Sequence, residues 1–189
     1  MKLSKIALVT IIASSFAAGI ANAAVNDQGS GVINFTGKVI NAPCSIPGDG
    51  TINVDLGQVA NKVLESGNKF SQSVQYTIAL ENCDLAAATG NGTDEKPQFP
   101  AVSKVKVTFS GTPDTTKTEL LANTGTSKGV GVRLINADGA VMKVGDTSVD
   151  LPLVEGPNKL SFSARVEANG NAVETGSIIS QATYALNYL

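Results

Sequence analysis

The chain has 189 residues, of which 42% are hydrophobic and 16% are charged, with 14 basic and 16 acidic side chains. This length suits a single domain with a substantial hydrophobic core. The net charge of −2 excludes the basic surface typical of nucleic-acid-binding proteins. The chain has no histidine, which removes the Ser–His and Cys–His pairs of nucleophilic catalysis and nearly every kind of protein zinc site. We therefore expect no catalytic residues, no metal site and no cofactor.

Residues 1–23 have the pattern of a secretory signal peptide. Lys2 and Lys5 give a positively charged start, residues 6–20 are apolar, and residues 21–23 read Ala-Asn-Ala. This pattern predicts export, with cleavage between Ala23 and Ala24. The alternative is an uncleaved membrane anchor, but the apolar run is short for a transmembrane span.

The chain has two cysteines, Cys44 and Cys83. In an exported protein an even pair of cysteines predicts a disulfide, and the spacing excludes a CxxC redox motif. Closing a loop of this length stabilises the fold by about 4 kcal/mol in the chain-entropy model. We interpret the pair as structural.

Strand-like alternation dominates the rest of the chain. Apolar and polar residues alternate with period two in four segments, at 74–81, 104–109, 130–134 and 160–167. In the last segment this alternation places Arg165 and Glu167 on the side that faces water. Turn-forming sequences rich in Gly, Pro, Asn and Asp separate the segments. The pattern predicts one all-β domain, a sandwich or a barrel.

Three further features are expected at the surface. The small, polar and Pro/Gly-interrupted stretch 84–101 predicts a loop, and residues 58–66 predict a single helical turn. The acidic residues lie mainly in turns and loops, where we expect them to be solvated. Examples are Asp49, Asp94, Glu95, Asp114, Asp138 and Asp146.

A first unusual strand follows the polar segment 24–30. Five alternate residues share one face of this strand and include two glycines: Gly31, Ile33, Phe35, Gly37 and Val39. Glycine weakens a strand unless something packs closely against it. The segment is therefore either an ordinary edge strand or a strand that packs against a partner.

A second unusual strand ends the chain. The last thirteen residues carry no charge, although natural edge strands usually carry lysine, proline or a bulge that prevents unwanted pairing. This strand is therefore either central in its sheet or completed by another chain. Its alternate residues from Gly176 onward are Ile178, Ser180, Ala182, Tyr184, Leu186 and Tyr188.

Together these features resemble the pilin subunits of the chaperone–usher pathway, of the type 1 or P-pilus kind. The resemblance covers essentially the whole chain after residue 23. It rests on the Gly31–Gly37 pattern leading to Ala42-Pro43-Cys44, on Cys83 after an alternating strand, and on Gly176 followed by the penultimate Tyr188.

The resemblance implies an immunoglobulin-like β-sandwich that lacks its seventh strand, G, and that a donor strand from a neighbouring subunit completes. Residues 24–40 would form the N-terminal extension and residues 41–189 the pilin domain. The donor residues would be Gly31, Ile33, Phe35, Gly37 and Val39. The strand that accepts the donor and contacts the chaperone would contain Gly176, Ile178, Ala182, Tyr184, Leu186 and Tyr188.

The resemblance also implies partners and a location. A periplasmic chaperone would lend a strand to the subunit, and an outer-membrane usher would exchange it for the extension of the next subunit. The product would be a fimbria on the cell surface that supports adhesion, built without enzymatic activity. Two alternatives stay open: a minor adaptor subunit of such a fibre, and a self-standing secreted β-sandwich that binds carbohydrate. Folding without a partner strand would distinguish the last of these from a pilin.

Overall fold

A computed structural model describes residues 31–66, 69–86 and 100–189. Contacts divide the chain into two units, Met1–Val39 and Ile40–Leu189. The predicted signal peptide and its cleavage site between Ala23 and Ala24 lie outside the described residues, as do residues 87–99 of the predicted loop. In the first unit, residues 31–39 are extended and exposed, without helix or strand pairing.

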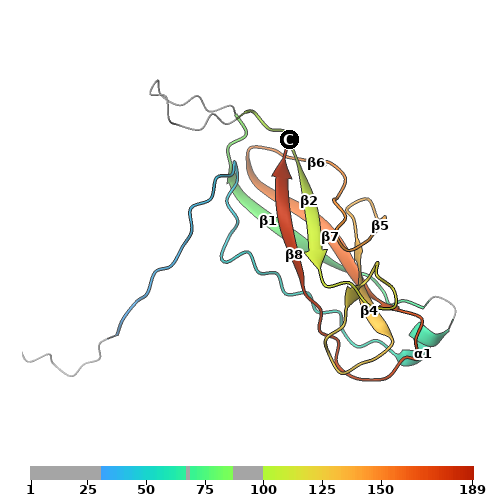
Figure 1. The fold of residues 1–189 in the computed structure, drawn as a ribbon. Coiled ribbons are helices and arrows are strands. Elements are labelled where there is room, and N and C mark those ends of the chain that lie inside the picture. The colour runs from blue at the N-terminus through green and yellow to red at the C-terminus, as the bar shows by residue number, and fades with distance from the viewer. Residues whose placement is uncertain (1–30, 67–68, 87–99) are drawn as a thin grey trace, which may run out of the picture. The chain divides into compact units, whose positions relative to one another are not determined.

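The second unit consists of two antiparallel sheets (Figure 1). The larger sheet has the order β1 (Val74–Cys83), β7 (Gly156–Ala168), β4 (Val130–Ile135) and β3 (Leu121–Ala122), and β5 (Val141–Met142) also pairs with β4. The smaller sheet has the order β6 (Leu151–Pro152), β2 (Lys104–Gly111) and β8 (Ala182–Tyr188). The four strands predicted from alternation are confirmed as β1, β2, β4 and β7.

The core consists of the side chains that the two sheets direct toward each other. The rings of Phe109 from β2 and Phe162 from β7 meet edge to face, with centroids 4.9 Å apart. Val105 and Val107 are completely buried beside them. Each such side chain stabilises the fold by roughly 1.5–3 kcal/mol through burial, so period-two alternation is enough to place the main core.

The strand order is that of an immunoglobulin-like sandwich with one strand missing. Strands β1, β7 and β4 occupy the B, E and D positions of such a fold, and β2 and β8 occupy C and F. Beside β8, on the side away from β2, no strand of the described residues occupies the G position. The expectation of an incomplete immunoglobulin-like sandwich is confirmed.

The sandwich has two distinct ends. At one, the disulfide end, Asp84 N–H donates to the carbonyl of Pro43, and Ser103 N–H donates to Leu189 at the C-terminus. The other, the helix end, carries α1 (Asn61–Glu65), as Figure 1 shows. The buried Leu64 of α1 packs in a cluster with Val130, Val166 and Ala168. The helical turn predicted within residues 58–66 is confirmed.

The C-terminal strand is shorter than the alternation predicts. It begins at Ala182, because residues 176–181 bond to the loop at 123–128 instead of to β2. The backbone N–H groups of Ser127 and Thr124 donate to Ser177 and Ile179, at 3.0 and 2.8 Å. A side chain at Gly176 would collide with Thr126 and Ser127. This close approach accounts for the glycine, which lies six residues before the strand begins.

The outer face of the larger sheet holds a buried ionic cluster. Glu167 is only 5% exposed, although alternation predicts that it faces water. Its carboxylate accepts hydrogen bonds from Arg133, Arg165 and Lys117, at 3.2, 2.7 and 3.1 Å. Burial alone would raise the pKa of Glu167, but these three donors outweigh it and lower the pKa to about 2. The loop at 114–120, which carries Lys117, contributes to this burial.

Candidate functional site

The outer edge of β8 carries a row of unpaired backbone groups. Leu189 and Lys104 exchange two backbone hydrogen bonds, at 2.8 and 3.0 Å. In an antiparallel pair such bonding alternates, so residues 183, 185 and 187 also bond toward β2. Ala182, Tyr184, Leu186 and Tyr188 therefore direct N–H and C=O away from β2, and neither these groups nor those of Ile178 and Ser180, just before the strand, have a backbone partner among the described residues. We call these residues the open edge: Ile178, Ser180, Ala182, Tyr184, Leu186 and Tyr188.

The side chains of the open edge face the core but are only half-buried. Ile178, Ala182, Tyr184, Leu186 and Tyr188 all pack against the main cluster without being enclosed by it. The hydroxyls of Ser180 and Tyr188 are buried and have no hydrogen-bond partner among the described residues. The same residues therefore combine an incompletely covered apolar face with an unpaired backbone, as a missing neighbouring strand would leave them.

A second unpaired segment lies at residues 51–59. Ile52, Val54 and Leu56 are half-buried and alternate with exposed residues, as in a strand. Among the described residues, this segment forms no backbone ladder. Side chains close its turns instead, since Asp49 accepts from Thr51 N–H and Asp55 accepts from Gly57 N–H, both at 2.9 Å. The alternation of segment 51–59 is visible in the sequence, although no strand was predicted there.

Tyr184 links the open edge to the turn that precedes this segment. Its hydroxyl donates to the carbonyl of Gly50 at 3.0 Å. A cavity of about 340 Å³ lies beside this contact, lined by Tyr184 and by Ile46, Pro47, Gly50, Thr51, Ile52, Asn53, Thr77 and Ala79. Burial, and then the nearby carboxylate of Asp49, raise the pKa of Tyr184. Gly50 has φ +76°, and a side chain there would press on the hydroxyl at 3.2 Å. The sequence alone does not indicate this link.

The extension presents apolar side chains to solvent. Ile33, Phe35 and Val39 are 77%, 90% and 99% exposed, and neither Gly31 nor Gly37 has a neighbour that a Cβ would meet. Residues with this alternation normally bury one face in a sheet. Of the residues predicted to act as donor and acceptor, those on β8 form one edge, while the donor residues lie on a separate unit of the chain.

The predicted disulfide is confirmed. Cys44 and Cys83 are bonded and buried, at a separation of 39 in sequence. Ser45 and Glu81, the neighbours of the disulfide, exchange two backbone hydrogen bonds at 2.8 and 2.9 Å. The disulfide therefore joins the root of the extension directly to the end of β1.

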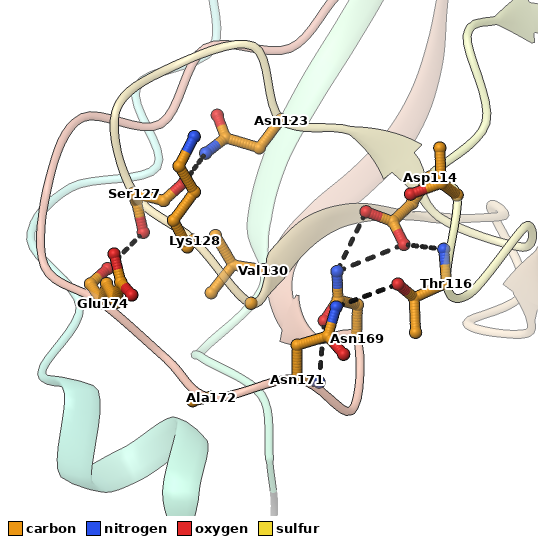
Figure 2. A pocket seen from close by; sticks show the side chains of 12 residues that line it. Asp114, Thr116, Asn123, Ser127, Lys128, Val130, Asn169, Asn171, Ala172 and Glu174 are labelled. Carbon is orange, nitrogen blue, oxygen red and sulfur yellow. Dashed lines mark hydrogen bonds between the residues drawn. The ribbon is translucent and has the colours of Figure 1, made fainter.

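A polar pocket of about 350 Å³ at the helix end bears on the carbohydrate-binding alternative (Figure 2). Asp114, expected at the surface, is 7% exposed there and accepts from Thr116 N–H and from the amide of Asn169. Asn171 donates to the Thr116 hydroxyl at 2.9 Å. These groups bond to one another and close the surrounding loops, so the pocket does not favour a sugar site.

The residues that the structure describes contain neither a helix that could span a membrane nor a cluster that could hold a metal ion. No helix in this part of the chain is long and apolar enough to cross a membrane. No three His, Cys, Asp or Glu side chains in the same part are grouped so that they could hold a metal ion. The features left to explain are the open edge and the exposed extension.

Comparison with known proteins identifies the family. Residues 33–189 match the family model for fimbrial protein. The chain is 42% identical over 170 residues to an uncharacterised fimbrial-like protein of Escherichia coli K12, YbgD, which covers 86% of this chain and 87% of that protein. It is 36% identical to the major MR/P fimbria protein of Proteus mirabilis, over 100% of this chain and 99% of that protein.

Solved structures agree with this relationship. A chaperone–usher pilus structure matches with a TM-score of 0.67 at 30% identity, covering 86% of this chain and 97% of that one. The P pilus rod subunit PapA matches with a TM-score of 0.62, also at 30% identity, covering 78% of this chain and 100% of that one. With the fold, the open edge and the disulfide in place, the chain belongs to the fimbrial protein family of chaperone–usher pilins.

Proposed function

We propose that this protein is a structural subunit of a cell-surface fimbria, and that it polymerises by donor-strand exchange. Residues 31–39 of one copy insert beside β8 of another copy and occupy the missing G position. The observation that carries the proposal is the match between the open edge, with its unpaired backbone and half-buried side chains, and an exposed extension with strand alternation. The role is structural and involves no catalysis.

The energy of insertion comes from both partners. Burying Ile33, Phe35 and Val39 contributes roughly 5–9 kcal/mol by area bookkeeping. New ladder hydrogen bonds to the open edge add to this, as in other cases of β-augmentation. Gly31 and Gly37 let the donor backbone approach the half-buried tyrosines of β8 closely. Because the contact is head to tail and does not close on itself, it produces a filament.

The ends of the sandwich determine the strand direction that suits a fibre. The extension leaves the domain at Pro43, which is at the disulfide end together with the C-terminal end of β8. Insertion antiparallel to β8 puts the donor's domain at the opposite, helix end of the acceptor. Parallel insertion would put the donor's domain at the disulfide end of the acceptor. The acceptor's own extension leaves from that same end, so the two would compete for space. We therefore expect antiparallel insertion.

The assembly route follows from the family. After cleavage between Ala23 and Ala24, a periplasmic chaperone would lend a strand to the open edge, which otherwise exposes apolar side chains and unpaired backbone. At an outer-membrane usher the extension of the next subunit would replace that strand. The finished fimbria at the cell surface would support adhesion.

The proposal is tested by adding the donor as a peptide. The oxidised domain 41–189 is refolded with and without a peptide spanning residues 26–40, and its thermal unfolding is followed. Because the peptide fills the G position, we expect a large rise in Tm. The matched control is the same peptide with Phe35→Asp, which should give no rise. A stable domain that is indifferent to the peptide would contradict donor-strand exchange.

A further inference from the structure

The disulfide end of the domain is acidic. Glu81, Asp84 and Glu155 are exposed there, and none of them forms an ion pair among the described residues. They lie close together, because Glu155 accepts from the N–H of Leu85 at 3.2 Å and Glu81 bonds to Ser45. We call this trio the acidic pole. Of the nearby bases, Lys159 forms no ion pair with the residues that the structure describes, whereas Lys104 and Lys106 are already paired with Asp150.

The helix end carries three exposed lysines. Lys69 accepts a backbone hydrogen bond from Ala168 at the end of β7, and Asn169 donates to Gly129, next to Lys128. Lys62 lies on α1. None of these lysines forms an ion pair among the described residues. We call Lys62, Lys69 and Lys128 the lysine pole.

The two poles lie at opposite ends of one strand. Glu155 immediately precedes β7, and Lys69 bonds to its last residue. Thirteen residues of strand separate them by about 40 Å. Glu65 and Glu174 share the lysine pole, and the nearby Asp114 is buried and bonded to Asn169, so these exposed side chains together have a small positive balance. The acidic pole with Lys159 has a negative balance. One domain therefore presents unlike charges at its two ends.

The length of the linker brings these poles together in a fibre. Only residues 40–43 lie between the last donor position, Val39, and the disulfide-bonded Cys44. Fully extended, this linker spans at most about 18 Å. The acidic pole surrounds the linker's root, since Asp84 donates to Pro43 and Glu81 bonds to Ser45. A donor strand in the open edge thus holds the donor's acidic pole close to the acceptor's helix end.

We propose that consecutive copies make a second contact, in which the lysine pole of the acceptor domain docks on the acidic pole of the donor domain. This inference rests on the proposed donor-strand exchange and names the surface that accompanies it. Unlike charges on facing surfaces raise the rate of encounter and select orientation. The contact is solvent-exposed, so salt screens it. The contact between the poles favours the orientation of the two subunits in which the donor's extension enters the open edge with its domain at the acceptor's helix end.

The test compares assembly of full-length mature protein with that of charge variants, at low and high salt. In the triple variant Lys62→Glu, Lys69→Glu and Lys128→Glu, like charges face each other, and we expect assembly about tenfold slower at low salt. Combining it with Glu81→Lys, Asp84→Lys and Glu155→Lys in one chain exchanges the poles and should restore the rate. The single variants Lys159→Glu and Lys128→Glu change the net charge by the same amount. Lys159 lies near the acidic pole, so Lys159→Glu should not slow assembly, whereas Lys128→Glu should.

The stabilising peptide of residues 26–40 separates this contact from strand exchange itself. It has no domain attached, so it should raise the Tm of the triple variant as much as that of the wild type. Assembly of the triple variant at the wild-type rate, with the same salt dependence, would overturn the docking of the poles. Loss of the peptide's effect in the triple variant would overturn it too, because these lysines would then act on the open edge or the fold. Loss of the effect in the wild type would instead refute donor-strand exchange.

Discussion

On the outer face of β7, Glu167 accepts hydrogen bonds from three cations beneath the loop at 114–120. Replacing it by glutamine removes the buried anion of Arg165 and Lys117 and leaves Arg133 paired only with the more exposed Glu119. Breaking such a buried cluster costs about 3 kcal/mol or more. We therefore expect Glu167→Gln to lower the free energy of unfolding by that amount in urea denaturation. Glu119→Gln is the control, because its side chain is 44% exposed, and it should cost less than about 1 kcal/mol.

The same residue makes stability depend on pH in acid. The pKa of Glu167 is lowered from 4.5 to about 2 in the fold, so the unfolded chain binds its proton more readily. Its contribution of about 3 kcal/mol is therefore complete above pH 4.5 and is lost as the pH falls toward 2. Glu167→Gln should flatten this part of the curve of unfolding free energy against pH. An unchanged slope would show that Glu167 does not cause it.

Glu167 also shows what alternation predicts and what it does not. The sequence places Glu167 and Arg165 correctly on the outer face of β7, because period two determines the face. It does not predict that Glu167 is buried, because a loop some fifty residues earlier contributes the covering Lys117. Asp114 is buried for the same kind of reason, through its bonds to Asn169. The burial of these side chains depends on contacts distant in sequence.

At the scale of the element, the backbone of β8 should show an alternating pattern of hydrogen exchange. The N–H groups of Thr183, Ala185 and Asn187 point toward β2, whereas those of Tyr184 and Leu186 point outward. In the domain without a donor, we expect the first three to exchange slowly and the last two quickly. After the peptide of residues 26–40 binds, all five should be protected. Amide exchange followed by NMR measures this directly. Slow exchange of Tyr184 and Leu186 before binding would mean that another group already covers the edge.

The sequence predicts the faces of these elements better than their ends or their partners. Apolar alternation from Ile178 to Tyr188 is correct, and these side chains do share one face. The strand nevertheless begins at Ala182, because the residues before it form hydrogen bonds with the loop at 123–128 instead of with β2. Segment 51–59 has strand alternation but forms no ladder among the described residues. Alternation reports which side of a segment is buried, and pairing depends on which neighbour is present.

At the scale of the whole molecule, a head-to-tail fibre carries tension through each subunit in series. Load from the donated strand enters the next domain through residues 40–43 and reaches Cys44. From there the disulfide passes it to Cys83 at the end of β1, which pairs with β7 over most of its length. Without the disulfide, the load would fall on the backbone hydrogen bonds that join Pro43 and Ser45 to Asp84 and Glu81, and then on segment 51–59, which has no ladder of its own among the described residues. The disulfide therefore protects segment 51–59, which lies inside the loop that it closes.

This path predicts how fibres respond to pulling after the disulfide is removed. In the double variant Cys44→Ala and Cys83→Ala, subunits should unfold at lower force. The disulfide's contribution of about 4 kcal/mol to the free energy of unfolding is lost, and the load reaches segment 51–59. The chain from position 44 to position 83, a sequence separation of 39, should then add up to about 140 Å to the extension of each subunit. Single-fibre force spectroscopy measures both quantities, and the oxidised wild type, in which the loop stays closed, is the control. Equal extensions in the two fibres would show that tension reaches the core by another route, through the strands themselves.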